Sequence, residues 1–72
     1  MNYDEIDYLI ASDLKVVGDR FINQTKVSLI RACGFTEAIE VDRYNNVING
    51  QEWLDAAMSI GYLTVPCVVV NK

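Results

Sequence analysis

The sequence contains no histidine, only two cysteines and one proline, and its apolar runs are short. Without histidine, no thiol–imidazole catalytic pair can form, and one pair of cysteines is too few for a four-ligand zinc site. No apolar run approaches the roughly 18 residues that a membrane-spanning helix needs. The N-terminus is acidic, unlike the basic start of a signal peptide. We therefore expect a cytoplasmic protein that does not enter a membrane.

Length and composition indicate one small globular domain. The chain has 72 residues, of which 51% are apolar and 22% are charged, and disordered chains have a lower apolar content. Domains typically begin near 50 residues, so a second one would not fit. We expect residues 1–72 to form a single domain, and nothing in the composition calls for a cofactor.

Acidic residues are concentrated at the N-terminus. Six lysines and arginines against ten aspartates and glutamates give a net charge of −4, and residues 1–13 contain the whole acidic excess. Two interpretations of this segment stay open, a docking surface for a basic partner or a solvated end. The basic residues are spread out, without the cluster that is typical of proteins that bind duplex nucleic acid. Nucleic acid is therefore expected to be at most a weak partner.

Both cysteines lie in apolar surroundings. Cys33 ends the run at 29–33, and Cys67 precedes three valines. Such contexts predict buried, inert thiols that behave as small hydrophobic side chains. A disulfide between them is disfavoured in a reducing compartment.

The first of two predicted helices spans about 24–33. Asn23 or Thr25 is expected to cap it, because a short side-chain oxygen can accept from an unpaired first-turn N–H. Gly34 is expected to end it, since glycine tolerates the positive φ common at that position.

The second predicted helix begins at Gly50 or Gln51 and ends at Ile60. Asn49 and Glu52 stand three residues apart, which predicts a capping box. The apolar stripe of this helix consists of Trp53, Ala56, Ala57 and Ile60, widened by Leu54 and Met58.

Strand patterns occupy the rest of the chain. Residues 1–13 fit either a helix or a short strand, because short apolar runs do not distinguish the two. Residues 39–48 alternate apolar and polar around an asparagine pair, which predicts a hairpin. Residues 65–70 are apolar throughout, as in parallel strands covered on both faces, so 47–70 is expected to form a βαβ unit. The predicted fold class is α/β (α+β), with a small mixed sheet of about four strands and two main helices.

The order of these motifs resembles the ParB N-terminal-like domain, whose fold is shared with sulfiredoxin. The segments that carry the resemblance across residues 8–70 are Gly34-Phe35, Ile39-Glu40-Val41-Asp42, Val47-Ile48-Asn49-Gly50, Leu54-Asp55-Ala56-Ala57, Gly61 and Val65-Pro66-Cys67-Val68-Val69. Upstream, Ser12-Asp13-Leu14 and residues 20–26 resemble the opening strand and first loop of the family. The resemblance implies a compact ParB/sulfiredoxin-like fold.

The same resemblance implies that the family's chemistry is missing. In ParB proteins the glycine that matches Gly50 is followed by Glu-Arg-Arg, which binds nucleotide phosphates, and in sulfiredoxin a nucleophilic cysteine lies there. This sequence has Gln51, Glu52 and Trp53 instead. Phosphate binding needs donors and positive charge at a helix N-terminus, and a carboxylate repels it. We therefore expect no enzymatic activity, no CTP binding and no helix-turn-helix within these residues.

Trp53 has two open interpretations. Where the family has an arginine, its side chain is either an exposed aromatic anchor for a partner or a core residue that packs over the sheet. Tyr44 and Phe21 are candidates for the same patch. The candidate partner-binding residues are Phe21, Tyr44, Gly50, Gln51, Glu52 and Trp53.

The preferred hypothesis is a non-enzymatic interaction protein that binds a protein partner at the corner formed by Gly50 to Trp53. Small free-standing domains of this kind suggest an accessory role in a phage, prophage or plasmid. The alternative is a nucleotide- or nucleic-acid-binding module of ParB type. Its candidate anion contacts are Arg20, Lys26 and Arg43, joined by Arg31 if folding gathers them on one face.

Two further possibilities complete the predictions. A remnant metal-dependent nuclease or transferase would have to use Glu40, Asp42 or Glu52, and the lack of histidine and of a basic phosphate clamp disfavours it, so no metal site is expected. A homodimer is the second possibility, because a small chain with a mixed sheet needs cover for its sheet edges.

Overall fold

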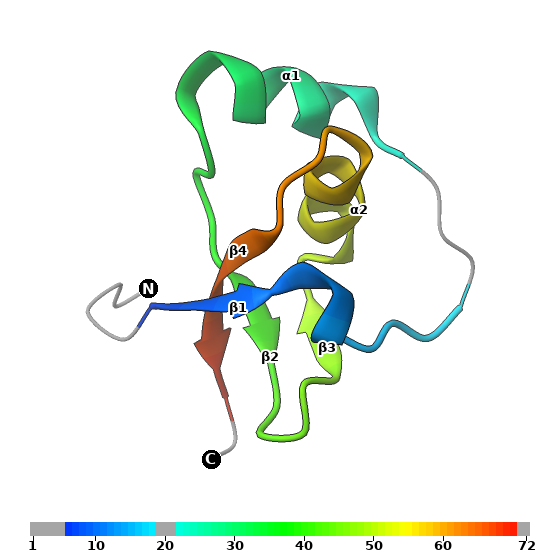
Figure 1. Ribbon diagram of the computed structural model, residues 1–72, viewed down its shortest axis with the longest axis vertical. Helices are drawn as coiled ribbons and strands as arrows, with labels where there is room; N and C mark the ends of the chain where they lie inside the picture. The colour runs from blue at the N-terminus through cyan, green and yellow to red at the C-terminus, as the bar shows by residue number, and fades with distance from the viewer. Residues whose placement is uncertain (1–5, 19–21, 71–72) are drawn as a thin grey trace.

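A computed structural model describes residues 6–18 and 22–70 (Figure 1). Its elements in chain order are β1 (Asp7–Ile10), a 3-10 turn η2 (Ala11–Asp13), α1 (Gln24–Cys33), β2 (Ile39–Val41), β3 (Val47–Asn49), α2 (Gln51–Ser59) and β4 (Thr64–Val69). The four strands form one mixed sheet. The predicted fold class, a small mixed sheet with two helices, is confirmed.

The strand order in the sheet is β1-β4-β2-β3. β4 pairs antiparallel with β1 and parallel with β2, and β2 pairs antiparallel with β3. β3 therefore runs opposite to β4, with β2 between them. The prediction that 47–70 forms a parallel βαβ unit is wrong, because the chain first turns back through the hairpin. The parallel pair is β2 with β4.

The ambiguous N-terminal segment contains a strand. The register of β1 on β4 places Tyr8 opposite Pro66 and Leu9 opposite Val65. This segment is a strand because it pairs with β4, more than fifty residues later in the chain. The periodicity of a short apolar run gives no information about such a distant partner. Pro66 lies just before the pairing of β4 with β2 begins at Cys67, so the sheet does not need the N–H that proline lacks.

Helix α1 has the predicted bounds and cap. Asn23 Oδ1 accepts hydrogen bonds from the backbone N–H groups of Thr25 (2.9 Å) and Lys26 (3.2 Å). Gly34 follows the last turn with a φ of +83°, as expected. The predicted burial of Cys33 is wrong, because its side chain is exposed. The inner side of α1 is formed by Val27 and Ile30, and Cys33 lies one turn beyond it.

Helix α2 starts differently from the prediction. Its N-cap is Gly50 in the left-handed conformation, with no side-chain cap hydrogen bond, so the predicted capping box of Asn49 and Glu52 is wrong. Asn49 belongs to β3, and its Oδ1 accepts from the Gly50 N–H (3.0 Å). A side chain at Gly50 would meet the backbone of Ile39, since an added Cβ would lie 3.2 Å from Ile39 Cα. The chain can turn tightly from β3 into α2 because this residue is glycine.

The core lies between α2 and the sheet, and α1 packs on α2. The largest fully buried side chains are Trp53, Ile39, Leu54, Val41, Val65 and Cys67. Ala56 and Ala57 are also fully buried, so the small side chains of α2 bring the helix close to its neighbours. In the described part of the chain, neither helix has the length and apolarity required to cross a bilayer.

Candidate functional site

The corner at the start of α2 is mostly closed. Gly50 is buried and the Trp53 side chain is 1% exposed, whereas Glu52 is exposed and Gln51 is half-buried. The interpretation of Trp53 as an exposed anchor is therefore wrong, and the core interpretation is confirmed. Trp53 opens a run of α2 that is buried all round, from Trp53 to Ala57, because the helix lies between the sheet and α1.

Trp53 is held by polar and aromatic contacts on several sides. Its Nε1–H donates to Glu37 Oε2 (3.2 Å), and Lys26 Nζ lies 4.6 Å from the centroid of the ring. The ring of Phe35 lies at 5.9 Å. Phe35 in turn contacts Tyr62 in an edge-to-face arrangement at 5.6 Å. These contacts give the corner a structural role in joining α1 to α2.

Phe35 and Tyr62 were missed as site residues by the sequence reasoning, although a signal was present. Each is the first residue after the glycine that follows a helix, where an apolar side chain commonly folds back. The pattern predicts two separate contacts. It does not show that the two aromatic rings would meet each other.

The other predicted partner-binding residues do not join Trp53. Tyr44 is exposed in the β2–β3 turn, which lies at the opposite end of the molecule from α1 (Figure 1). Lys26, which contacts Trp53, belongs to α1. Phe21, the third member of the predicted patch, lies outside the described residues.

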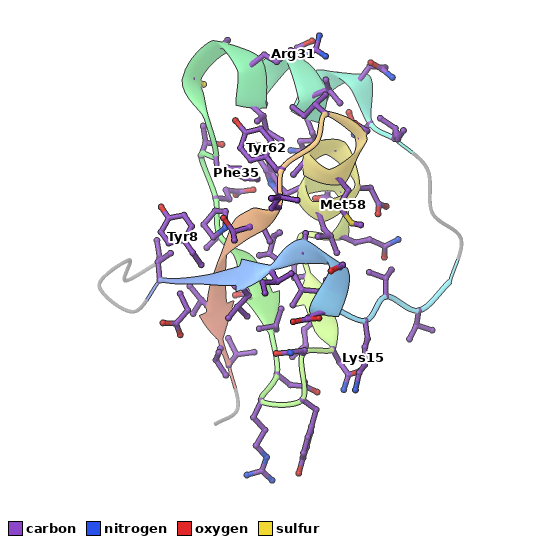
Figure 2. All side chains as sticks on the ribbon, in the orientation of Figure 1. Tyr8, Lys15, Arg31, Phe35, Met58 and Tyr62 are labelled. Carbon is purple, nitrogen blue, oxygen red and sulfur yellow. The ribbon has the colours of Figure 1, made fainter. Side chains whose placement is uncertain are left out.

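The predicted anion contacts are also dispersed. Lys26 is in α1 and stacks on Trp53, whereas Arg43 is in the hairpin turn with its Cζ 5.2 Å from the ring centroid of Tyr44. Figure 2 labels Arg31 at the α1 end of the molecule, away from that turn. Arg20 lies outside the described residues. Among the residues that can be placed, no single basic face gathers these side chains.

Asp42 organises the hairpin turn. Its Oδ1 accepts from the backbone N–H groups of Tyr44 (2.8 Å) and Asn46 (2.9 Å), and its Oδ2 accepts from Asn46 Nδ2 (2.9 Å). The side-chain hydrogen bond from Asn46, followed by the backbone hydrogen bond from the same residue, lowers the pKa of the Asp42 carboxyl. Within residues 6–18 and 22–70, no three acidic or cysteine side chains form a metal site, so Glu40, Asp42 and Glu52 do not act together.

An exposed apolar surface extends from the pair Phe35 and Tyr62, away from Trp53. We call it the apolar strip, and its members are the exposed Tyr8, Ile10, Met58, Tyr62 and Leu63 together with the partly buried Phe35. Leu63 is 81% exposed and Tyr8 is 71% exposed. Figure 2 shows Tyr8, Phe35, Tyr62 and Met58 near β1 and the loop that leads into β4.

Two shallow grooves run into this strip. The first, of about 170 Å³, lies between Tyr8, Phe35, Glu37 and Pro66. The second, of about 240 Å³, lies between Ile10, Met58, Tyr62 and Leu63. The two grooves are neighbours, because Phe35 lines the first, Tyr62 lines the second, and the two rings are in contact.

Acidic side chains accompany the strip. Glu37 lines the first groove, Asp7 is exposed on β1, and Asp13 is exposed at the end of η2. Among the described residues that line the two grooves, there is no lysine or arginine. Apolar side chains with acidic neighbours suit a partner that is both apolar and basic.

A scan of protein-family models and a search of curated proteins find no match for this chain. The resemblance to the ParB/sulfiredoxin-like family therefore stays a prediction, and the case for function depends on the surfaces described above.

Proposed function

We propose that this protein is a non-enzymatic binding module that docks a protein partner on the apolar strip. The observation that carries the proposal is the exposure of Leu63 and Tyr8 beside two neighbouring grooves. Large apolar side chains exposed singly are ordinary, but a contiguous exposed group with a polar margin marks an interaction site. Aromatic side chains such as Tyr8 and Tyr62 are enriched among the residues that contribute most to protein binding.

The strip has more support than the corner at Gly50. In the corner, Gly50 and Trp53 are buried, so a partner would meet chiefly Gln51 and Glu52. The strip offers apolar area in the free chain, and covering it would remove that area from water at about 25 cal/mol per Å².

A random-peptide library displayed on phage tests the proposal. Peptides selected on the wild-type protein should bind Leu63→Ser about tenfold more weakly, because the most exposed member of the strip is lost. Val17→Ser is the matched control, since Val17 is 90% exposed and outside the strip, and it should bind as the wild type does.

Two results would overturn the proposal. One is the absence of any enriched peptide. The other is a set of peptides that ignores Leu63→Ser and loses affinity for Gln51→Ala, which would place the docking surface at the corner.

The ParB-type alternative, a nucleotide- or nucleic-acid-binding module, has less support. Lys26 and Arg43 lie at opposite ends of the molecule (Figure 1), whereas phosphate binding requires positive charge to converge. Calorimetry at low salt with CTP, ATP and a short DNA duplex should give no binding heat. A saturable heat that disappears with added salt would support the alternative.

A further inference from the structure

The two edges of the sheet differ. At the β3 edge, the backbone of Lys15 bridges to the hairpin: its N–H donates to Asn45 O (2.8 Å), and its carbonyl accepts from Val47 N (2.8 Å). At the β1 edge, no strand of the described residues pairs with the outer side of β1. The edge next to the apolar strip is therefore the more open of the two.

The hydrogen-bond pattern between β1 and β4 shows which backbone groups of β1 face the open edge. The N–H of Ala11 donates to Leu63 O at 2.9 Å, and hydrogen-bonded and non-bonded pairs alternate along an antiparallel ladder. Tyr8, opposite Pro66, and Ile10, opposite Thr64, therefore occupy non-bonded positions. Their N–H groups point away from β4, toward the open edge.

Side chains and backbone present a combined docking feature. Tyr8 and Ile10 are two residues apart on β1, so their side chains share a sheet face, and each lines one of the two grooves. An added strand would bond to the backbone at this edge and place alternate side chains toward the grooves.

Charge indicates the chemistry of that strand. Asp7 is exposed at the start of β1, Asp13 is exposed in the turn that follows β1, and Glu37 lies in the first groove. The acidic excess of the whole chain falls within residues 1–13. A second copy of this chain would bring two such acidic segments together across the edge, and like charges placed opposite each other are destabilising. Lysines or arginines in the added strand would instead be attracted.

We propose that β1 binds an extended segment of another protein, with alternating apolar and basic residues, as a fifth strand of the sheet. This inference rests on the proposed function and specifies its binding mode. The apolar residues of the segment contact the strip, its backbone bonds to Tyr8 and Ile10, and its basic residues lie on the opposite face of the sheet, near Asp7.

A substitution in β1 separates strand addition from simple apolar contact. Ile10 has φ −69°, which proline also adopts, and Leu9 before it is in a strand, as proline requires. Ile10→Pro therefore removes the outward N–H and keeps the bonds to β4. Ile10→Val is the matched control, because it keeps the N–H and an apolar side chain.

The probe is a short fluorescein-labelled peptide of alternating valine and lysine, and fluorescence anisotropy measures its binding to the full chain. We expect Ile10→Pro to bind it about tenfold more weakly than the wild type does, and Ile10→Val to bind within about twofold. A matched peptide of valine and glutamate should not bind, and added salt should weaken the valine–lysine peptide. Circular dichroism checks that both variants are folded. If Ile10→Pro unfolds, the same peptide with N-methyl groups on alternate residues replaces it and should not bind the wild type.

The outcomes separate the two proposals. If Leu63→Ser loses the selected library peptides while Ile10→Pro binds the valine–lysine peptide normally, strand addition is wrong and the binding module stands. Equal binding of the acidic peptide would refute the charge argument. Dimers in sedimentation that Ile10→Pro dissociates would make a second copy the occupant and overturn the inference. Failure of both the library and the peptide would overturn both proposals.

Discussion

At the scale of single residues, the two cysteines are opposites despite their similar sequence contexts. Cys67 is fully buried, and burial raises the pKa of its thiol to about 11. Cys33 is exposed at the end of α1. Since the thiolate is the reactive form, we expect a thiol reagent such as DTNB to modify Cys33 alone in the native protein and both cysteines in denaturant. The variant Cys33→Ser should be unreactive when folded. Rapid reaction of two thiols in the native state would contradict this assignment.

Trp53 gives the second prediction at this scale. Trp53→Ala should lower the free energy of unfolding by about 3–5 kcal/mol, the usual loss for a buried tryptophan. Stability of a chain this short is on the order of 5 kcal/mol, so this variant should keep at most about 2 kcal/mol of its free energy of unfolding. Trp53→Phe keeps a ring but loses the hydrogen bond to Glu37, and should cost about 1 kcal/mol beyond the lost ring area. Urea titration followed by circular dichroism measures both, and a fully stable Trp53→Ala would show that the side chain is not part of the core.

At the scale of elements, the start of α2 depends on the glycine at position 50. Gly50 and Gly61 have nearly the same backbone angle, φ +88° and +89°, so alanine at either position should cost about 1–2 kcal/mol for its left-handed conformation. Only Gly50 lies against another backbone, at Ile39, whereas nothing lies within 4 Å of a Cβ at Gly61. We expect Gly50→Ala to lose about 1 kcal/mol or more beyond Gly61→Ala in urea titration. Equal losses would show that Ile39 moves aside freely.

The hairpin between β2 and β3 is the second element with a prediction. The bonds from Asn46 keep the pKa of Asp42 below its ordinary value of 3.8, so the carboxylate favours the folded state. This stabilisation is complete above pH 3.8 and is lost as the pH falls through the lower, folded-state pKa. The melting temperature of the wild type should therefore fall more steeply below about pH 3.8 than that of Asp42→Asn, which cannot ionise. Parallel melting curves for the two proteins would contradict the role of the carboxylate.

At the scale of the whole molecule, the sequence was most informative where a structure depends on neighbouring residues, although the capping box predicted for α2 was wrong. Helix α1 was predicted with correct bounds because Asn23 and Gly34 mark its ends locally, and the hairpin turn because Asn45 tolerates a positive φ. The direction of β4 relative to β3 was not predictable in this way, because it depends on which strand lies between them.

The candidate site shows the same division. Trp53 lies on the inner stripe that its helical spacing indicates, and the comparison with an arginine in another family was what suggested exposure. The apolar strip could not be found from local pattern, because it combines β1, residue 35 and the loop before β4. Segments far apart in the chain meet there only after the strands have paired.

The bridge at Lys15 also bears on how far such assembly can proceed. Because the backbone of Lys15 bridges to Asn46 at the start of the β3 edge, that edge is partly covered, and a strand that joins this sheet meets the more open edge at β1. Growth into a fibril requires two vacant sides on every unit. The bridge at Lys15 narrows the second side, and so disfavours growth beyond a one-to-one complex.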